Sequence, residues 1–282
     1  MNSDDAAAPG DDVTPGERDS LPFDTSVASQ ARMYDHLLGG KDNYAADRAA
    51  VEAILRIYPE MAFAARGNRA FLGRAVRYLA GEAGIRQFLD IGTGIPTAEN
   101  THQVAQAIAP ESRVVYVDHD PVVLAHARAL LTSSLAGATE YIDADLRDTG
   151  KILGQARRLL DFAKPVAVTL LAVLHVIPDA DDPHAIVAKL MDALPAGSYL
   201  ALSHGGTDLV DRSKQQSFQS TWSGRVKQQF AGRTREQVAR FFDGLDLVEP
   251  GLVPVEEWRP EPGTASTGPS AMWGAVGRKR RP

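Results

Sequence analysis

Short apolar segments and longer amphipathic segments alternate along most of this chain. Apolar runs predict buried strands at residues 86–91, 114–117, 166–174 and 199–203. Amphipathic patterns predict helices over residues 98–108, 182–194 and 235–242. Strands that alternate with helices indicate an α/β fold with a doubly wound, mostly parallel, Rossmann-like sheet. A third strand that ends near Asp143 and an antiparallel pair at 245–248 and 271–277 bring the expected number of strands to seven.

The segment before the first strand has a different pattern. Residues 28–80 are helical in periodicity, with an interruption at Pro59 and a turn at Gly39 and Gly40. A helical segment in this position predicts a cap over the carboxyl edge of the sheet. Residues 207–231 form a polar helical stretch with an apolar residue at every fourth position, which predicts a lid insertion.

These patterns divide the chain into four parts. We expect an acidic, disordered head, a helical cap or lid, a core that contains the lid insertion, and a basic tail, at residues 1–21, 22–85, 86–277 and 278–282.

One strand–turn–helix–strand unit carries the clearest chemistry. The strand that contains Asp90 runs into a turn with Gly92 and Gly94, and the next strand delivers Asp118. Glycine lets the backbone approach a ligand closely, and a carboxylate can accept hydrogen bonds from ribose hydroxyls. The unit therefore predicts a site for a ligand with an adenosine-like half, at the carboxyl ends of the strands.

The details of the turn distinguish between two such ligands. A dinucleotide site requires a third small residue, but Thr97 stands there, after Pro96. Asp90 would also repel the first phosphate of a dinucleotide, whereas S-adenosylmethionine has no phosphate and carries two positive charges. The turn resembles motif I of the class I S-adenosylmethionine-dependent methyltransferases, with Pro96 departing from the usual third glycine.

The same resemblance supplies further cofactor residues. The segment 139–148 is similar to the loop after the third strand of these enzymes, which implies that Asp145 reaches the adenine amino group and that the Leu146 N–H reaches a ring nitrogen. His119, directly after Asp118, belongs to the same expected cofactor site.

The N-terminal segments carry a more specific resemblance. Residues 22–26, 31–48 and 68–76, and later segments up to 247–255, resemble one bacterial methyltransferase family of high-GC filamentous bacteria. The resemblance spans about residues 22–279 and leaves the substrate undefined. It implies a methyltransferase with S-adenosylmethionine as cofactor. We expect the distinctive loop of this segment to close over the methionine carboxylate with Tyr34, Lys41, Asn43 and Tyr44.

Two histidines are candidates for the catalytic base. His175 follows the apolar run 166–174, and Leu174-His175 with Asp179 resembles a segment of small-molecule O-methyltransferases whose histidine is the base. His204 follows the next predicted strand and is the competing candidate. Asp179, Asp181 and Asp182 could suggest a magnesium site, but helix capping before Pro183 explains them more simply, and we expect no metal.

Composition limits the other partners. The net charge is −6, and the first 20 residues hold six acidic residues against Arg18 alone, so the body is nearly neutral. A nearly neutral body argues against nucleic acid as a partner. No apolar run has the length of a membrane span, the first residues lack the apolar core of a secretory signal, and cysteine is absent. These features favour the cytoplasm; they leave the oligomeric state open.

The sequence therefore predicts an S-adenosylmethionine-dependent methyltransferase that acts on a small organic acceptor, with an aromatic or hydroxyl-bearing molecule as the favoured kind. A non-catalytic regulator or scaffold that binds S-adenosylmethionine is one alternative. An NAD-binding oxidoreductase with the same fold is a weaker one.

Overall fold

The computed structural model describes residues 24–97, 99–130, 133–263 and 268–280. Its centre is one mixed sheet with the strand order β3-β2-β1-β4-β5-β8-β6, and a short strand β7 also pairs with β8. The strands are β1 Gln87–Ile91, β2 Arg113–Asp118, β3 Ala138–Asp143, β4 Ala167–Leu171, β5 Tyr199–Gly205, β6 Leu245–Leu247, β7 Val253–Pro254 and β8 Met272–Lys279. The first five are parallel, and β8 is antiparallel to β5. The predicted doubly wound fold is confirmed.

Two layers of helices cover the sheet, because the strands are apolar on both faces. Phe88 of β1 packs with α3 and α4, whereas its neighbours Leu89 and Ile91 pack with α6, α7 and α9 on the opposite face. The helices are α3 Met61–Arg77, α4 Thr101–Ile108, α5 Pro121–Leu130, α6 Thr149–Ala156, α7 Pro183–Asp192 and α9 Arg235–Ala239. Short helical turns complete the chain at Tyr78–Glu82, Leu174–Val176, Asp179–Asp181, Arg240–Phe242 and Val255–Glu257.

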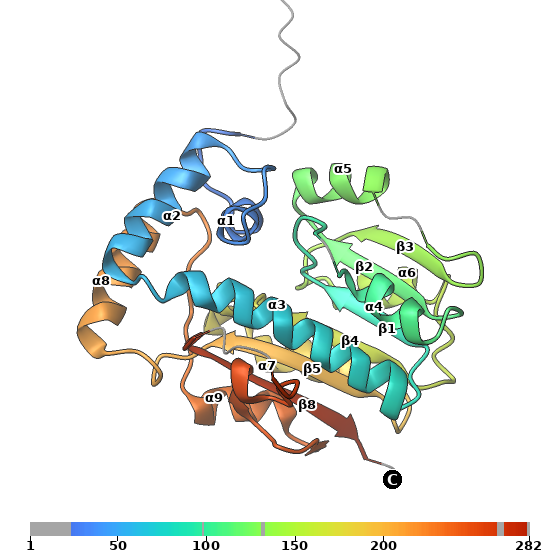
Figure 1. Ribbon diagram of the computed structural model, residues 1–282. Helices are drawn as coiled ribbons and strands as arrows, with labels where there is room; N and C mark the ends of the chain where they lie inside the picture. The colour runs from blue at the N-terminus through green and yellow to red at the C-terminus, as the bar shows by residue number, and fades with distance from the viewer. Residues whose placement is uncertain (1–23, 98, 131–132, 264–267, 281–282) are drawn as a thin grey trace, which may run out of the picture.

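The expected N-terminal cap separates into two structures. Helices α1 (Gln30–Leu37) and α2 (Ala45–Ile57) pack with α8 (Arg212–Ser223) in a cluster of their own, which contains Met33, Ile54 and Trp222. Figure 1 shows these three helices grouped beside one end of the sheet. Helix α3 instead runs along the sheet, because its apolar side, with Phe71 and Val76, is buried against the strands.

Several predicted boundaries differ from the structure, and three of them change where residues named above lie. Strand β4 ends at Leu171 because Ala172 takes a φ of +55°, so His175 lies in a separate helical turn. Strand β5 extends through His204 to Gly205. Strand β8 extends through Lys279, so two residues of the expected basic tail belong to the sheet. The expected acidic head lies outside the described residues.

The strand order reverses between β1 and β4, and a doubly wound sheet binds its ligand at such a switch point. Among the described residues, no helix combines the length and the apolar character needed to cross a membrane.

Candidate functional site

A first cavity of about 310 Å³ opens at the carboxyl ends of β1 and β2, under α1. Eight of the predicted cofactor residues line it: Tyr34, Asp90, Gly92, Gly94, Asp118, His119, Asp145 and Leu146. Residues from four separate segments of the sequence thus meet at the switch point of the sheet, as the doubly wound topology requires.

The glycine turn and Asp118 form one rigid unit. Gly92 and Gly94 have φ angles of +75° and +64°, which residues other than glycine rarely adopt. The Gly94 N–H donates to Oδ2 of Asp118 at 2.9 Å, and the N–H groups of His119 and Asp120 donate to Oδ1 at 2.8 and 3.0 Å. Burial raises the pKa of the Asp118 carboxyl although these three donors oppose the shift.

Asp90 lies beneath the turn and is buried. Its two oxygens accept hydrogen bonds from the hydroxyls of Thr101 and Thr169, at 2.7 and 2.6 Å. Burial raises the pKa of Asp90 against the effect of these bonds. The guanidinium of Arg69 acts on the same carboxyl electrostatically and lines the cavity. Arg69 could not be recognised from the sequence, because an arginine on an amphipathic helix gives no local signal of a site.

The loop after β3 closes another side of the cavity. Arg147 pairs with Asp145 at 2.9 Å and with Asp181 at 2.7 Å, and all three side chains are partly exposed. Leu146 is buried beside them. The side chain of His119 is 60% exposed, so it lies at the rim of the cavity.

The expected lid loop contributes only Tyr34 to the first cavity. Lys41, Asn43 and Tyr44 line neither this cavity nor the second one described below. The Asn43 amide donates to Asp35 at 2.9 Å and its oxygen accepts from Arg48 at 3.1 Å, while the Tyr44 N–H donates to Asp47 at 2.8 Å. These polar groups fold the loop and begin α2, which explains why they are not turned toward the cavity.

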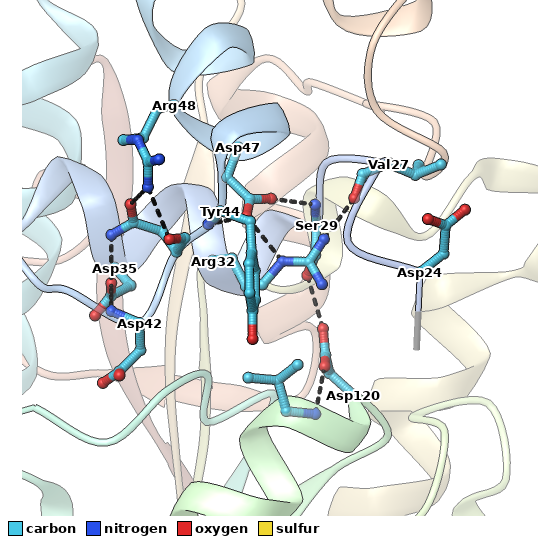
Figure 2. Close-up of polar contacts among 12 residues, drawn as sticks. Asp24, Val27, Ser29, Arg32, Asp35, Asp42, Tyr44, Asp47, Arg48 and Asp120 are labelled. Carbon is cyan, nitrogen blue, oxygen red and sulfur yellow. Dashed lines mark hydrogen bonds and ion pairs between the residues drawn. The ribbon is translucent and has the colours of Figure 1, made fainter. Parts of the chain in front are cut away.

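A buried ion pair holds α1 to α2, and a serine at the start of α1 joins this helix to the cavity wall (Figure 2). Arg32 donates from Nε to Asp47 at 2.9 Å, and the carboxylate also accepts from the N–H of Ser29 at 2.9 Å. The Ser29 hydroxyl then donates to Asp120 at 2.7 Å, next to Asp118. Helix α1 is therefore tied both to its neighbour and to the glycine-turn side of the first cavity.

A second cavity of about 400 Å³ lies between the cap helices and β5. Its lining is largely apolar and aromatic and includes Tyr58, Phe218, Phe230 and Met272. Of the regularly spaced apolar residues in 207–231, Phe218 and Phe230 line this cavity, whereas Trp222 is buried in the cluster of α1, α2 and α8.

His175 lines the second cavity and is buried. Its Nε2 lies 2.9 Å from the amide nitrogen of Gln30, which lines the first cavity. Its Nδ1 has no hydrogen-bond partner among the described residues. Burial, and then the positive charge of Arg233, lower the pKa of His175 to about 4, so the imidazole is neutral at physiological pH. The Gln30–His175 pair therefore stands between the two cavities.

His204 has no nitrogen to offer a substrate. Its Nε2 accepts from Arg233 at 2.8 Å, which leaves Nδ1 to donate to the Gly205 carbonyl at 3.0 Å. The ring is fully buried and lines neither cavity, so its position does not favour the predicted role as a competing base. Arg233, which no sequence pattern marks, also donates to the carbonyls of Leu174 and Ile177 at 3.0 Å and so holds the His175 turn.

The three aspartates after His175 have separate partners. Asp179 pairs with Arg233, Asp181 pairs with Arg147, and Asp182 caps α7 by accepting from the Ala185 N–H at 3.1 Å. Within the described ranges, no three His, Asp or Glu side chains are grouped so as to hold a metal ion.

Known proteins resemble this chain over most of its length. A family model described as S-adenosyl methyltransferase matches residues 16–280. A DUF574-family protein of Streptomyces avermitilis is 45% identical and its structure superposes with a TM-score of 0.86, over 90% of this chain and 98% of that one. A candidate methyltransferase of Thermobifida fusca is 42% identical with a TM-score of 0.81, over 91% and 96% of the two chains. No curated protein matches significantly. The chain therefore belongs to the S-adenosyl methyltransferase family and is an S-adenosylmethionine-dependent methyltransferase.

Proposed function

We propose that the first cavity binds S-adenosylmethionine, and that the second cavity binds a compact, largely apolar methyl acceptor. The cofactor supplies a methyl group on a positively charged sulfur. The protein must hold the accepting atom in line with that methyl group, at about 3 Å. Two cavities that meet at the Gln30–His175 pair offer this arrangement, and that juxtaposition is the observation that carries the proposal.

The residues of the first cavity fit the cofactor. A Cβ atom added to Gly94 would meet nothing within 4 Å, so there is space beside the turn. A carboxylate has about four acceptor positions. Three of those on Asp118 accept backbone N–H groups, which leaves one for a ribose hydroxyl rather than the two hydroxyls expected from the sequence. Asp145 and Leu146 line the same cavity, and we assign the adenine ring to them.

Arg69 is our candidate for the methionine carboxylate. It lines the first cavity from α3, and a guanidinium matches a carboxylate in charge and in hydrogen-bond geometry. This role takes the place of the one expected for Lys41, Asn43 and Tyr44, whose polar groups lie outside the cavity.

The acceptor is proposed from the lining of the second cavity. Aromatic side chains such as Tyr58, Phe218 and Phe230 favour an aromatic or otherwise flat, apolar molecule. A volume of about 400 Å³ is in the range of small-molecule sites. The polar group that faces this cavity from the cofactor side is His175.

Ala231→Leu is a direct test, because Ala231 lines the second cavity and not the first. The added bulk should leave the affinity for S-adenosylhomocysteine unchanged in calorimetry. It should abolish transfer of labelled methyl to a small-molecule extract that the wild type methylates. Ala188→Leu, on the exposed side of α7 and outside both cavities, is the matched control. Equal transfer by the Ala231 and Ala188 variants would contradict the proposal.

Membership of the family replaces the two alternatives that the sequence left open. The family match favours S-adenosylmethionine over NAD as the cofactor. It also favours an enzyme over a non-catalytic regulator or scaffold. A parallel titration with NADH is the control for the cofactor, and we expect no binding in it.

A further inference from the structure

The side-chain amide of Gln30 makes two contacts through the same atom. Its nitrogen lies 2.8 Å from the carbonyl oxygen of Ala172 and 2.9 Å from Nε2 of His175. The nitrogen and oxygen of a glutamine amide are assigned from their partners. A backbone carbonyl can only accept, so the atom that contacts Ala172 must be the NH₂ group. The orientation of the Gln30 amide is therefore fixed by Ala172 rather than by the histidine.

The same NH₂ group then fixes the proton on His175. Because it donates, Nε2 of His175 must accept, and a neutral imidazole carries its single hydrogen on the other nitrogen. His175 is neutral at physiological pH, since burial and Arg233 lower its pKa to about 4. Its Nδ1 therefore bears the hydrogen.

The backbone around Ala172 is held firmly in place. Ala172 has a φ of +55°, which is unfavourable for alanine and persists only where the surroundings enforce it. Its N–H donates to the hydroxyl of Ser203 at 2.9 Å, and that hydroxyl donates to Asn68 at 2.5 Å. Strand β5 and helix α3 thus aim the Ala172 carbonyl at Gln30.

The protonated nitrogen lies directly behind the lining of the second cavity. Nδ1 of His175 is buried and has no hydrogen-bond partner among the described residues. A Cβ atom added to Gly205, another lining residue, would lie 3.8 Å from Nδ1 and 2.9 Å from the Phe230 ring, so a ligand reaches Nδ1 when that ring shifts. The His175 ring also packs against Phe230 of the same lining, with 5.1 Å between the ring centroids. A buried N–H without a partner is unfavourable, so a ligand that supplies an acceptor there gains affinity.

We infer that His175 donates a hydrogen bond to the methyl acceptor, and that the acceptor carries a carbonyl or ionised phenolic oxygen at this point. Gln30 is the positioning residue that keeps the hydrogen on Nδ1. The inference rests on the proposed function, because it takes the second cavity as the acceptor site. It replaces the role of His175 as a base, since the nitrogen on the side of the second cavity has no lone pair to offer.

The proton position can be measured without any ligand. In ¹⁵N-labelled protein at pH 7, two-bond proton–nitrogen correlations of the His175 ring should show a hydrogen on Nδ1 and a bare Nε2. A hydrogen on Nε2, or on both nitrogens, would overturn the inference. Gln30→Met removes the NH₂ donor without adding a charge, so the hydrogen should be shared between Nδ1 and Nε2. Gln216→Met makes the same change at a residue that lines the second cavity and should leave the hydrogen on Nδ1.

A pair of probe molecules tests the donor itself. Acetophenone and ethylbenzene have similar shapes, but only acetophenone has an oxygen that accepts a hydrogen bond. The ratio of the ethylbenzene to the acetophenone dissociation constant should fall roughly 2- to 10-fold in His175→Phe relative to the wild type, which is the range for one hydrogen bond. An unchanged ratio would overturn the donor role while leaving the acceptor cavity in place. Failure of both probes to compete with a methylated acceptor would instead count against the proposed function.

Discussion

The N–H of Gly94 donates to Oδ2 of Asp118 at 2.9 Å and thereby joins the turn after β1 to the end of β2. The two residues are 24 positions apart in the sequence. The bond orients the carboxylate before any ligand arrives, so little reorganisation is needed on binding. The first cavity is in this sense already formed before a ligand binds.

Asp118→Ala should weaken binding of S-adenosylhomocysteine by about 10- to 100-fold, the range for loss of a hydrogen bond to a charged group. It should also destabilise the fold by about 1 to 3 kcal/mol, because buried N–H groups lose their acceptor. Calorimetry and urea unfolding measure the two effects. Asp143→Ala, at the paired position of β3 and exposed, is the control and should change neither. Unchanged affinity in the Asp118 variant would count against its ribose contact.

Two glycines of the turn should respond differently to alanine. At Gly92 a Cβ atom would lie 2.5 Å from the Val173 side chain, so Gly92→Ala should destabilise the fold by about 2 to 4 kcal/mol. At Gly94 the space is open, so Gly94→Ala should lose about 1 kcal/mol through its positive φ alone. The Cβ atom would nevertheless occupy ligand space and weaken S-adenosylhomocysteine binding.

Gly244→Ala separates the two effects, because Gly244 has a φ of +79°, equally open space and no place in either cavity. It should match Gly94→Ala in stability and the wild type in affinity. Equal affinities for the Gly94 and Gly244 variants would place the cofactor elsewhere.

His175 should make the fold sensitive to acid. Its pKa is lowered to about 4 in the folded protein, against about 6.5 when unfolded, so the unfolded state binds the proton more tightly. Stability is therefore highest above pH 6.5 and falls as the pH drops toward 4, by about 3 kcal/mol at most. His175→Phe should lose this part of the pH dependence, measured by urea unfolding between pH 4 and 7.

His119→Phe, which changes an exposed histidine, should retain the acid sensitivity of the wild type. Methyl transfer should also show no titration of His175 between pH 6 and 8. A histidine-dependent rise in activity with a midpoint near neutral pH, as expected for a base, would contradict this assignment.

Arg233→Lys should destabilise the fold although it keeps the charge. The buried guanidinium donates to two carbonyls and to His204, and a lysine ammonium cannot reproduce this planar set. We expect a loss of about 2 kcal/mol or more in urea unfolding. Arg225→Lys, at an exposed position, should stay within about 0.5 kcal/mol of the wild type. Similar stabilities for both variants would show that the guanidinium contacts are dispensable.

The sequence predicted those parts of the fold and site that depend on neighbours in the chain. The run from Asp90 to Asp118 shows its strands, turn and acids within a short segment, and the structure places all of them around one cavity. The alternation of apolar and amphipathic segments was also sufficient to predict the parallel strands of the sheet. The strand ends were less accurate, since Ala172 has no special sequence signal for its positive φ.

Contacts between distant segments could not be predicted in this way. Gln30 and His175 are 145 residues apart, and Ser203 and Asn68 are 135 apart. Nothing in the local pattern of Gln30 distinguishes it from a surface glutamine at the start of a helix. Asn43 and Tyr44 show the opposite case. Their polar groups suggested contacts with a ligand, but they form hydrogen bonds within the loop and at the start of α2.

Gln30 and Tyr34 lie on one helix, which the buried Arg32–Asp47 pair holds to α2. Tyr34 lines the first cavity, while Gln30 contacts His175 of the second. A substitution that shifts α1 should therefore alter ligand binding in both cavities together, although the residues of α1 belong to neither strand nor glycine turn.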